Sequence, residues 1–356
     1  MGGPQRKLWL DWQRGLAVLF MVEWHTYDAW RLEAVAQGRL HDWLNLVGGF
    51  AAPSFLYMAG VSQTLADGAR ERRGVPAMER RRDARGRALW LLGVAYLFRL
   101  SLWVVDGGWA SGGDVGGVAR AFALDVLKVD VLNVIAVALF VSAVAVVGRG
   151  AAGVLAALAL AASFAFLAPV VAGHAPADSP LAEYLWNSRA SFALFPWAAF
   201  LFAGAAVGRV SRDRDRPALL LLAGAGLWLL GLLADRAPPV YAYQDFWRAS
   251  PAWFLMRLGI VVGMTGVLMG LPAAADGALS WLRTLGRHSL FGYVVSVLLP
   301  YGSVSHVLHH RLSARAALGA VAAMIVFIWA SSSLLDRFQA RRAIRPPAAP
   351  PVPPGR

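Results

Sequence analysis

The fold is decided by the stretch LDWQRGLAVLFMVEWHTYDAW, residues 10–30. It is apolar over about twenty residues, the length that spans a bilayer core, and yet it contains Arg14, Glu23 and His25. No small-residue cleavage motif follows it, so we expect a retained transmembrane helix and not a signal peptide. Ionisable residues inside such a helix must face protein or water, which makes this helix the first candidate for a functional site.

The rest of the chain repeats this apolar pattern. Of 356 residues, 58% are hydrophobic and 15% are charged, and the mean hydropathy is +0.52. These values exclude a soluble enzyme. The sequence predicts an all-α polytopic membrane protein with about ten transmembrane helices, at residues 13–30, 43–66, 88–105, 129–147, 151–172, 190–208, 218–234, 252–272, 288–304 and 314–334.

Basic residues predict the orientation of these helices. If both termini are cytoplasmic, 23 of the 34 basic residues lie on the cytoplasmic side and eight lie on the opposite side. The arginine-rich segment 70–87 then anchors the topology, and we expect no nucleic-acid partner despite a net charge of +13. Residues 1–340 form one transmembrane domain, and the Pro-rich residues 341–356 form a disordered cytoplasmic tail.

The use of basic residues also indicates the source of the chain. Only Lys7 and Lys128 are lysine, and alanine is abundant. This composition is typical of a GC-rich bacterial genome, so we expect a multi-pass protein of the bacterial inner membrane. The bilayer is the expected partner, and a dimer is expected if the chain oligomerises.

The first helix places a cation and an imidazole on one face. Arg14 and His25 are eleven residues apart, which is three helical turns plus about 20° and about 16 Å along the axis. This spacing suits a long anionic molecule that enters from the cytoplasm, with its charged end at Arg14 and its reactive end at His25. Asp28, one turn further, can orient the ring and raise its basicity. Alternatively, His25 and Asp28 form a buried pair that only packs helices.

Further polar residues lie at or near membrane depth. His41 precedes a span rich in small residues and is either a site residue or a solvated loop histidine. Arg99, Asp130 and Asn133 form a substrate or structural polar network in which Asp130 is the expected ion partner of Arg99. A further group of polar side chains at a helix start forms either a phosphate site or a positive-inside anchor: Arg283, Arg287, His288 and Ser289.

Other chemistry is not indicated. The chain has no cysteine, so it has no disulfide, no thiolate nucleophile and no cysteine metal site. The phosphate-loop, zinc-protease and nucleophile-elbow motifs are not found in the sequence, and no dinucleotide-binding G-x-G-x-x-G stands at an expected strand-to-helix turn. The pair His309 and His310 has no carboxylate nearby in the sequence, and we expect no metal.

Several segments resemble a known family. The sequence is similar to the heparan-alpha-glucosaminide N-acetyltransferase family and its bacterial relatives over most of the ten spans. The segments that carry the resemblance are LDWQRGLAVLFMVEWH (10–25), GGFAAPSFLYMAG (48–60), YLFRLSLW (96–103), KVDVLNVIAV (128–137), SFALFPWAAFLFAGAAVG (191–208) and LGRHSLFGYVVS (285–296). The spacing of Arg14 and His25 is also similar to that in bacterial envelope O-acyltransferases.

The resemblance implies an acetyl-CoA-dependent transmembrane acyltransferase that delivers an acetyl group to a saccharide acceptor across the membrane. It implies Arg14 near the donor phosphates, and His25 and His41 around the thioester and the acceptor. His41 matches the loop histidine of the animal enzyme, where the place of His25 is taken by Asn, whereas His25 matches the O-acyltransferases. Ser296 stands where many relatives have a further histidine.

Two functions remain open from the sequence. The first is transfer of an acetyl or other short acyl group from cytoplasmic acyl-CoA to an extracytoplasmic or lipid-linked glycan, with histidine as general base or acyl carrier. The second is a transporter or flippase whose buried charges line the path. Binding of CoA and transfer of acetyl distinguish the two.

Overall fold

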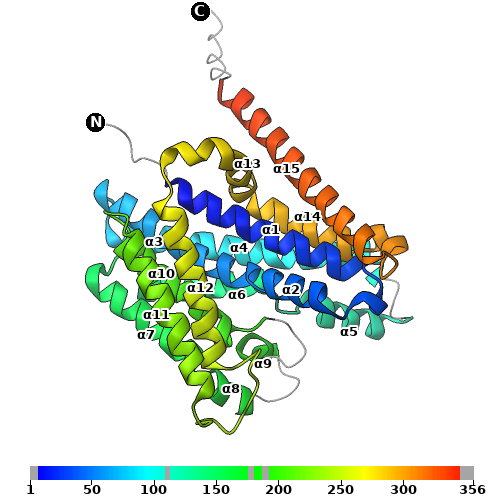
Figure 1. The fold of residues 1–356 in the computed structure, drawn as a ribbon, viewed down its shortest axis with the longest axis horizontal. Coiled ribbons are helices and arrows are strands. Elements are labelled where there is room, and N and C mark those ends of the chain that lie inside the picture. Colours follow the sequence, from blue (N-terminus) through cyan, green and yellow to red (C-terminus); the bar gives the residue numbers. More distant parts are fainter. Residues whose placement is uncertain (1–6, 109–112, 175–179, 187–191, 345–356) are drawn as a thin grey trace, which may run out of the picture.

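The computed structural model describes residues 7–108, 113–174, 180–186 and 192–344. Within these ranges the chain is helical between its turns, with one isolated β-bridge between Arg31 and Leu312 (Figure 1). The α-helices are α1 (Leu8–Trp30), α2 (Arg39–Gly48), α3 (Ala51–Arg72), α4 (Ala77–Val105), α5 (Val115–Val126), α6 (Val131–Ala145), α7 (Gly150–Phe166), α8 (Ala168–His174), α9 (Pro180–Leu185), α10 (Leu194–Val210), α11 (Pro217–Arg236), α12 (Pro251–Gly270), α13 (Asp276–Arg287), α14 (Ser289–Tyr301) and α15 (Ala314–Ile344). Short 3₁₀ helices lie at η1 (Glu33–Val35), η3 (Ala273–Ala275) and η4 (Ser303–Leu308).

The all-helical, membrane-embedded character is confirmed. Among the described residues, five segments are long and apolar enough to cross a membrane, and up to seven if each bent pair of helices forms one span. The five are α2 with α3, α4, α11, α12 and α15, and the bent pairs are α5 with α6 and α7 with α8. Each expected span overlaps a helix, but α10 and α14 are shorter and α1 carries charged residues. The count of ten and the orientation stay predictions.

Helix α1 occupies the centre of the bundle. It packs against α3, α13, α14 and α15, and Figure 1 shows it running through the middle of the molecule. Its side chains Trp12, Val18 and Tyr27 are almost completely buried. The deciding stretch is therefore a core helix, and its polar side chains face protein and not lipid.

Glycine sets how closely α3 and α10 approach. A Cβ atom added to Gly60 would lie 1.9 Å from the carbonyl oxygen of Leu201, and one added to Gly204 would lie 2.0 Å from that of Tyr57. No side chain fits in either place, so the two backbones are in direct contact. Gly60 belongs to the span rich in small residues that follows His41. This contact holds α3, which carries part of the site, against α10.

A buried ion-pair network joins four elements at one end of the bundle. Asp67 of α3 accepts hydrogen bonds from Arg80 of α4 at 2.8 Å, from Arg209 of α10 at 3.2 Å, and from the backbone N–H of Gly148 at 3.2 Å. Its side chain is 1% exposed. Glu71, one turn later, pairs with Arg80 and Arg212. Arg80 of the arginine-rich segment 70–87 is thus buried and helps to hold the helices together.

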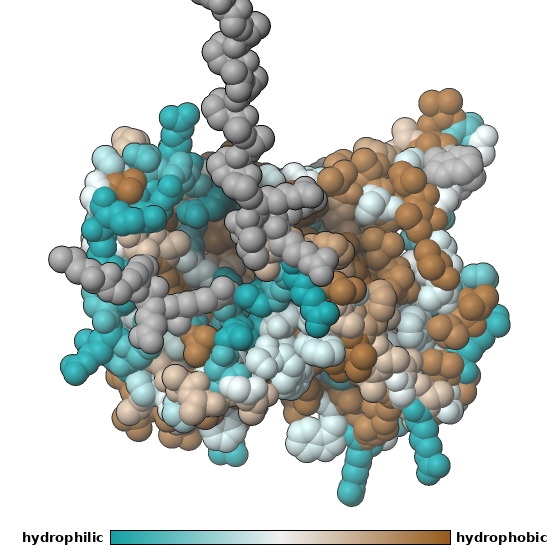
Figure 2. Space-filling view, turned by 90° about the horizontal axis from the view of Figure 1, so that it is seen from above, coloured by the Kyte–Doolittle hydropathy of each residue, from teal (hydrophilic) through white to brown (hydrophobic). Residues whose placement is uncertain are grey.

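The outer surface fits a lipid environment. Large apolar side chains are exposed along α4, α7, α11 and α15, for example Trp90, Leu155, Leu222 and Phe327. On the face in Figure 2, hydrophilic side chains gather toward the end where the N-terminus lies, and hydrophobic ones cover much of the remainder. Such extensive apolar exposure is expected where lipid covers the protein. Helix α15 extends to Ile344, and the rest of the expected tail, 345–356, lies outside the described residues.

Candidate functional site

Two neighbouring cavities lie beside α1. The first, here called the Arg14 cavity, has a volume of about 260 Å³ and is lined by Arg14 of α1, residues of α3 and α6, and Ser289 and Leu290 at the start of α14. The second, the His25 cavity, has a volume of about 580 Å³ and is lined by His25 and Asp28 further along α1. The arginine and the histidine of the first helix therefore face two adjoining spaces.

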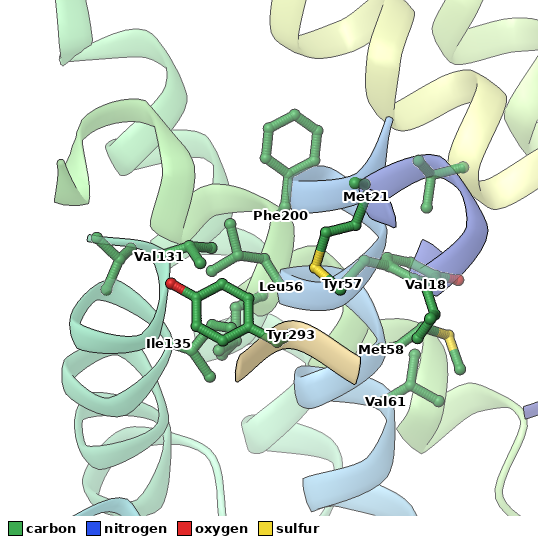
Figure 3. Close-up of a cluster of buried hydrophobic side chains, with 14 of the residues drawn as sticks. Val18, Met21, Leu56, Tyr57, Met58, Val61, Val131, Ile135, Phe200 and Tyr293 are labelled. Atoms are coloured by element: carbon green, nitrogen blue, oxygen red, sulfur yellow. The ribbon is translucent and has the colours of Figure 1, made fainter. Parts of the chain in front are cut away.

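A shared wall separates the two cavities. Phe55 of α3, Val131 of α6 and Tyr293 of α14 line both of them. Figure 3 shows the ring of Tyr293 near Ile135, with its hydroxyl directed toward Val131 at the start of α6. That hydroxyl donates a hydrogen bond to Asp130 at 3.4 Å, and the ring packs 5.4 Å from that of Phe98. The wall is thus held from α4, α6 and α14.

His25 has a defined hydrogen-bond partner. Its Nδ1 lies 3.2 Å from the hydroxyl oxygen of Ser296, and this hydroxyl donates to the carbonyl oxygen of Tyr293 at 3.0 Å. Because the single proton of Ser296 is used in that bond, its oxygen accepts from Nδ1–H of His25. This tautomer leaves Nε2 with a free lone pair, which is what a general base requires.

Asp28 does not bond to the imidazole. Its carboxylate accepts a hydrogen bond from Tyr301 at 3.0 Å and pairs with Arg31 at 3.1 Å. The ring of Tyr301 then meets that of His25 edge-on, with the ring centres 5.6 Å apart. Asp28 therefore reaches His25 through Tyr301, and Ser296 takes the orienting position that the sequence analysis gave to Asp28.

The structure divides the predicted phosphate-binding group. Arg14 and Ser289 line the same cavity. Arg14 donates a hydrogen bond to Ser62 and lies 3.9 Å from Asp11. Two other members, Arg283 and Arg287, line neither cavity. Arg283 pairs with Asp276, and Arg287 pairs with Asp336.

His41 lines neither of the two cavities. It belongs to α2, and its ring packs 5.9 Å from Trp24 and 6.2 Å from Tyr27. His41 is not among the residues that line the His25 cavity, although Asn45, one turn later, is. The geometry therefore brings His25 to the open space and holds His41 against α1.

Asp130 and Asn133 fix the start of α6 beside the shared wall. They form a capping box in which each side chain binds the backbone of the other end of the turn. Asn133 also donates to the hydroxyl of Tyr184 at 3.4 Å, and burial raises the pKa of Tyr184, which keeps this hydroxyl neutral. The expected ion pair of Arg99 with Asp130 is not seen in the described part of the chain, since Arg99 donates to the carbonyl oxygen of Asp125.

Three residues of α14 that line the His25 cavity were missed from the sequence: Tyr293, Val297 and Tyr301. Ser296 of the same helix was noted only for the histidine that relatives have in its place, and its contact with the imidazole was not predicted. Their spacing of three or four residues places them on one side of α14. The polar side chains of Tyr293, Ser296 and Tyr301 form a stripe on the apolar helix α14, and this stripe could have indicated the site as the stripe on α1 did. Lys128 lines this cavity too.

A comparison with protein families identifies the family of the chain. A family model described as "Heparan-alpha-glucosaminide N-acetyltransferase, catalytic" matches residues 6–241, about two thirds of the chain. The match includes α1 with Arg14 and His25, and it ends before α12 and α14. No curated protein matches the chain. Within the described ranges, no three His, Asp or Glu side chains are grouped so that they could hold a metal ion.

Proposed function

Because the chain belongs to the heparan-alpha-glucosaminide N-acetyltransferase catalytic family, we propose that it moves an acetyl or other short acyl group from cytoplasmic acetyl-CoA to an extracytoplasmic or lipid-linked glycan. Family membership indicates a transmembrane acetyltransferase. The identity of the donor, the nature of the acceptor and the role of histidine are parts of the proposal. So is the location in a bacterial inner membrane.

The observation that carries the proposal is the pair of cavities with one common wall. A cation lines the first cavity and an imidazole lines the second, and only Phe55, Val131 and Tyr293 are shared between them. A donor with a charged head and a long flexible arm fits such an arrangement. Its phosphates would remain at Arg14 while its thioester reaches the wall, and the acceptor would enter the His25 cavity.

Arg14 and the first residues of α14 support donor binding. The side chain of Arg14 is 29% exposed although it contacts Asp11. Ser289 and Leu290 at the start of α14 face the same space. A guanidinium beside a helix N-terminus favours phosphate, because both present N–H donors and positive charge.

The residues of the His25 cavity support proton transfer. In the proposed step, Nε2 of His25 accepts the proton of the acceptor amine or hydroxyl while that nitrogen or oxygen attacks the acetyl carbonyl carbon. The new C–N or C–O bond forms, the C–S bond breaks, and the proton on Nε2 passes to the leaving thiolate. The hydrogen bond to Ser296 favours the tautomer that this step needs, and the thioester and the acceptor would meet at the shared wall.

The test of the function is donor binding and acetyl transfer. The purified full-length protein in detergent is titrated with acetyl-CoA, and release of CoA is then followed with mixtures of amino sugars and glycans as acceptors. We expect saturable binding of acetyl-CoA and acceptor-dependent release of CoA. A transporter or flippase predicts neither, so a protein that is folded but fails both assays would refute the proposal.

Replacing Arg14 with glutamine should weaken acetyl-CoA binding by about tenfold or more, because one charge-assisted hydrogen bond contributes about 1.5–3 kcal/mol. The rate at saturating donor should change less than the affinity, since Arg14 lies in the other cavity from His25. Calorimetric titration with CoA and with acetyl-CoA measures the effect. The matched control is Arg287→Gln, whose guanidinium pairs with Asp336 and should leave the affinity unchanged. Equal affinities for wild type and Arg14→Gln would remove Arg14 from the donor site.

A further inference from the structure

Arg257 is a buried arginine of α12 that the proposed transfer step does not use. It lies beyond the part of the chain that the family model matches, and it is 8% exposed. Its guanidinium carbon lies over two aromatic rings, 4.5 Å from the ring centre of Phe50 and 5.4 Å from that of Trp253. Such contacts attract the cation, but they do not supply hydrogen-bond acceptors for all of its N–H groups.

Two buried N–H-bearing nitrogens at this place lack an acceptor among the described residues. Nη1 of Arg257 and Nε1 of Trp253 are both buried without a hydrogen-bond partner there. The other buried arginines, Arg80 and Arg209, differ because both pair with Asp67. A buried charge without a partner is strongly unfavourable, so such a site is expected where a ligand supplies the missing negative charge.

The guanidinium adjoins the His25 cavity. A Cβ atom added to Gly49 would lie 2.5 Å from Nη1 and 2.9 Å from Nη2 of Arg257, and Gly49 is one of the residues that line the cavity. Trp197 lines the cavity as well, and its ring packs 5.5 Å from that of Trp253. One glycine therefore separates this cation from the space where the acceptor is proposed to bind.

We propose that Arg257, with Trp253, binds an anionic group of the acceptor, either a carboxylate or a phosphate. The inference rests on the proposed function, because it makes the His25 cavity the acceptor site. It adds that the acceptor is acidic, through a uronic-acid carboxylate or through the phosphate of a lipid carrier. Arg257 would then select the acceptor without touching the reacting atoms.

The test compares pairs of probes in which one member carries an anionic group that the other member lacks. The purified full-length protein is titrated, without donor, with methyl β-glucuronide and methyl β-glucoside, and separately with a polyprenyl phosphate and the matching polyprenol. We expect the wild type to bind one anionic probe at least about tenfold more tightly than its neutral counterpart, as one hydrogen bond to a charged group provides. Preference for the glucuronide would identify an acidic sugar, and preference for the phosphate would identify a lipid carrier.

Variants assign the preference to Arg257. Arg257→Met should bind both members of a pair equally, with the affinity for the neutral probe unchanged, and Arg257→Lys should keep part of the preference. Gly49→Ala should reduce the preference as well, because its Cβ displaces the guanidinium. Gly263→Ala on the same helix is the control for folding, since nothing lies within 4 Å of its Cβ.

Two results would overturn the inference. One is a wild type that prefers neither anionic probe, and the other is a preference that persists in Arg257→Met, which would mean that Arg257 only packs between aromatic rings. Both are separate from failure of the proposed function, which appears as loss of acetyl-CoA binding by the wild type in a titration without acceptor probes.

Discussion

The variant His25→Ala should lose acetyl transfer almost completely, with kcat lower by about 10²–10⁴-fold, the range typical of a general base. The imidazole lines the cavity, its Nδ1 is held by Ser296 at 3.2 Å, and its Nε2 is left to accept a proton. Alanine removes that base and leaves Arg14 in place. The affinity for acetyl-CoA should therefore stay near the wild-type value, and stopped assays of CoA release together with calorimetry separate the two effects.

His41→Ala is the matched control for this prediction. Its ring packs on Trp24 and Tyr27 and does not line the cavity, so we expect a smaller loss of kcat. Full loss in His41→Ala with full activity in His25→Ala would reverse the assignment and favour the loop histidine that the family resemblance implies.

The variant Ser296→Ala should lower kcat, because alanine no longer holds the tautomer of His25, and it should leave the affinity for the donor intact.

The variant Asp67→Ala should destabilise the folded protein by about 3–5 kcal/mol, the cost of leaving buried charges without their partner. Asp67 compensates Arg80 and Arg209, which are 5% and 8% exposed, and it also accepts the backbone N–H of Gly148. Its removal leaves two buried guanidinium groups with less negative charge nearby. Unfolding in detergent, followed by circular dichroism against temperature and denaturant, measures the loss.

The control for Asp67 is an ion pair at the protein surface. Asp83 pairs with Arg70, and its side chain is 36% exposed, so Asp83→Asn should cost less than about 1 kcal/mol. If Asp67→Ala is no less stable than Asp83→Asn, the buried network does not tie α3, α4 and α10 together. Preserved acetyl-CoA binding in the fraction of Asp67→Ala that remains folded would show that the network acts on stability and not on the site.

The sequence predicted the membrane-embedded helical fold well, because most apolar stretches are long enough to cross a bilayer. It predicted α13 and α2 poorly. Helix α13 is short and amphipathic, packs on α1, and has no long apolar run. The count of crossings is also harder to predict, since the bends of 62° after α5 and of 45° after α7 depend on packing and not on composition.

The site was predicted only where one helix was enough. The spacing of Arg14 and His25 on α1 places both beside cavities, as local helical geometry requires. The partner of His25 was not predicted, because Ser296 is 271 residues away and only the packing of α14 on α1 brings it near. Asp28 was the expected partner because it lies one helical turn beyond His25, but its carboxylate binds Tyr301 and Arg31.

The wall of Phe55, Val131 and Tyr293 has a consequence for the cell. The side chains of Phe55, Val131 and Tyr293 line both cavities, so the two spaces meet at apolar and aromatic groups that bind water poorly. A passage wide enough for CoA would also conduct protons and sodium, and would discharge the gradients that a membrane maintains. Under the proposed function, a wall of this kind would let a two-carbon group cross between the cavities and would keep CoA and ions out.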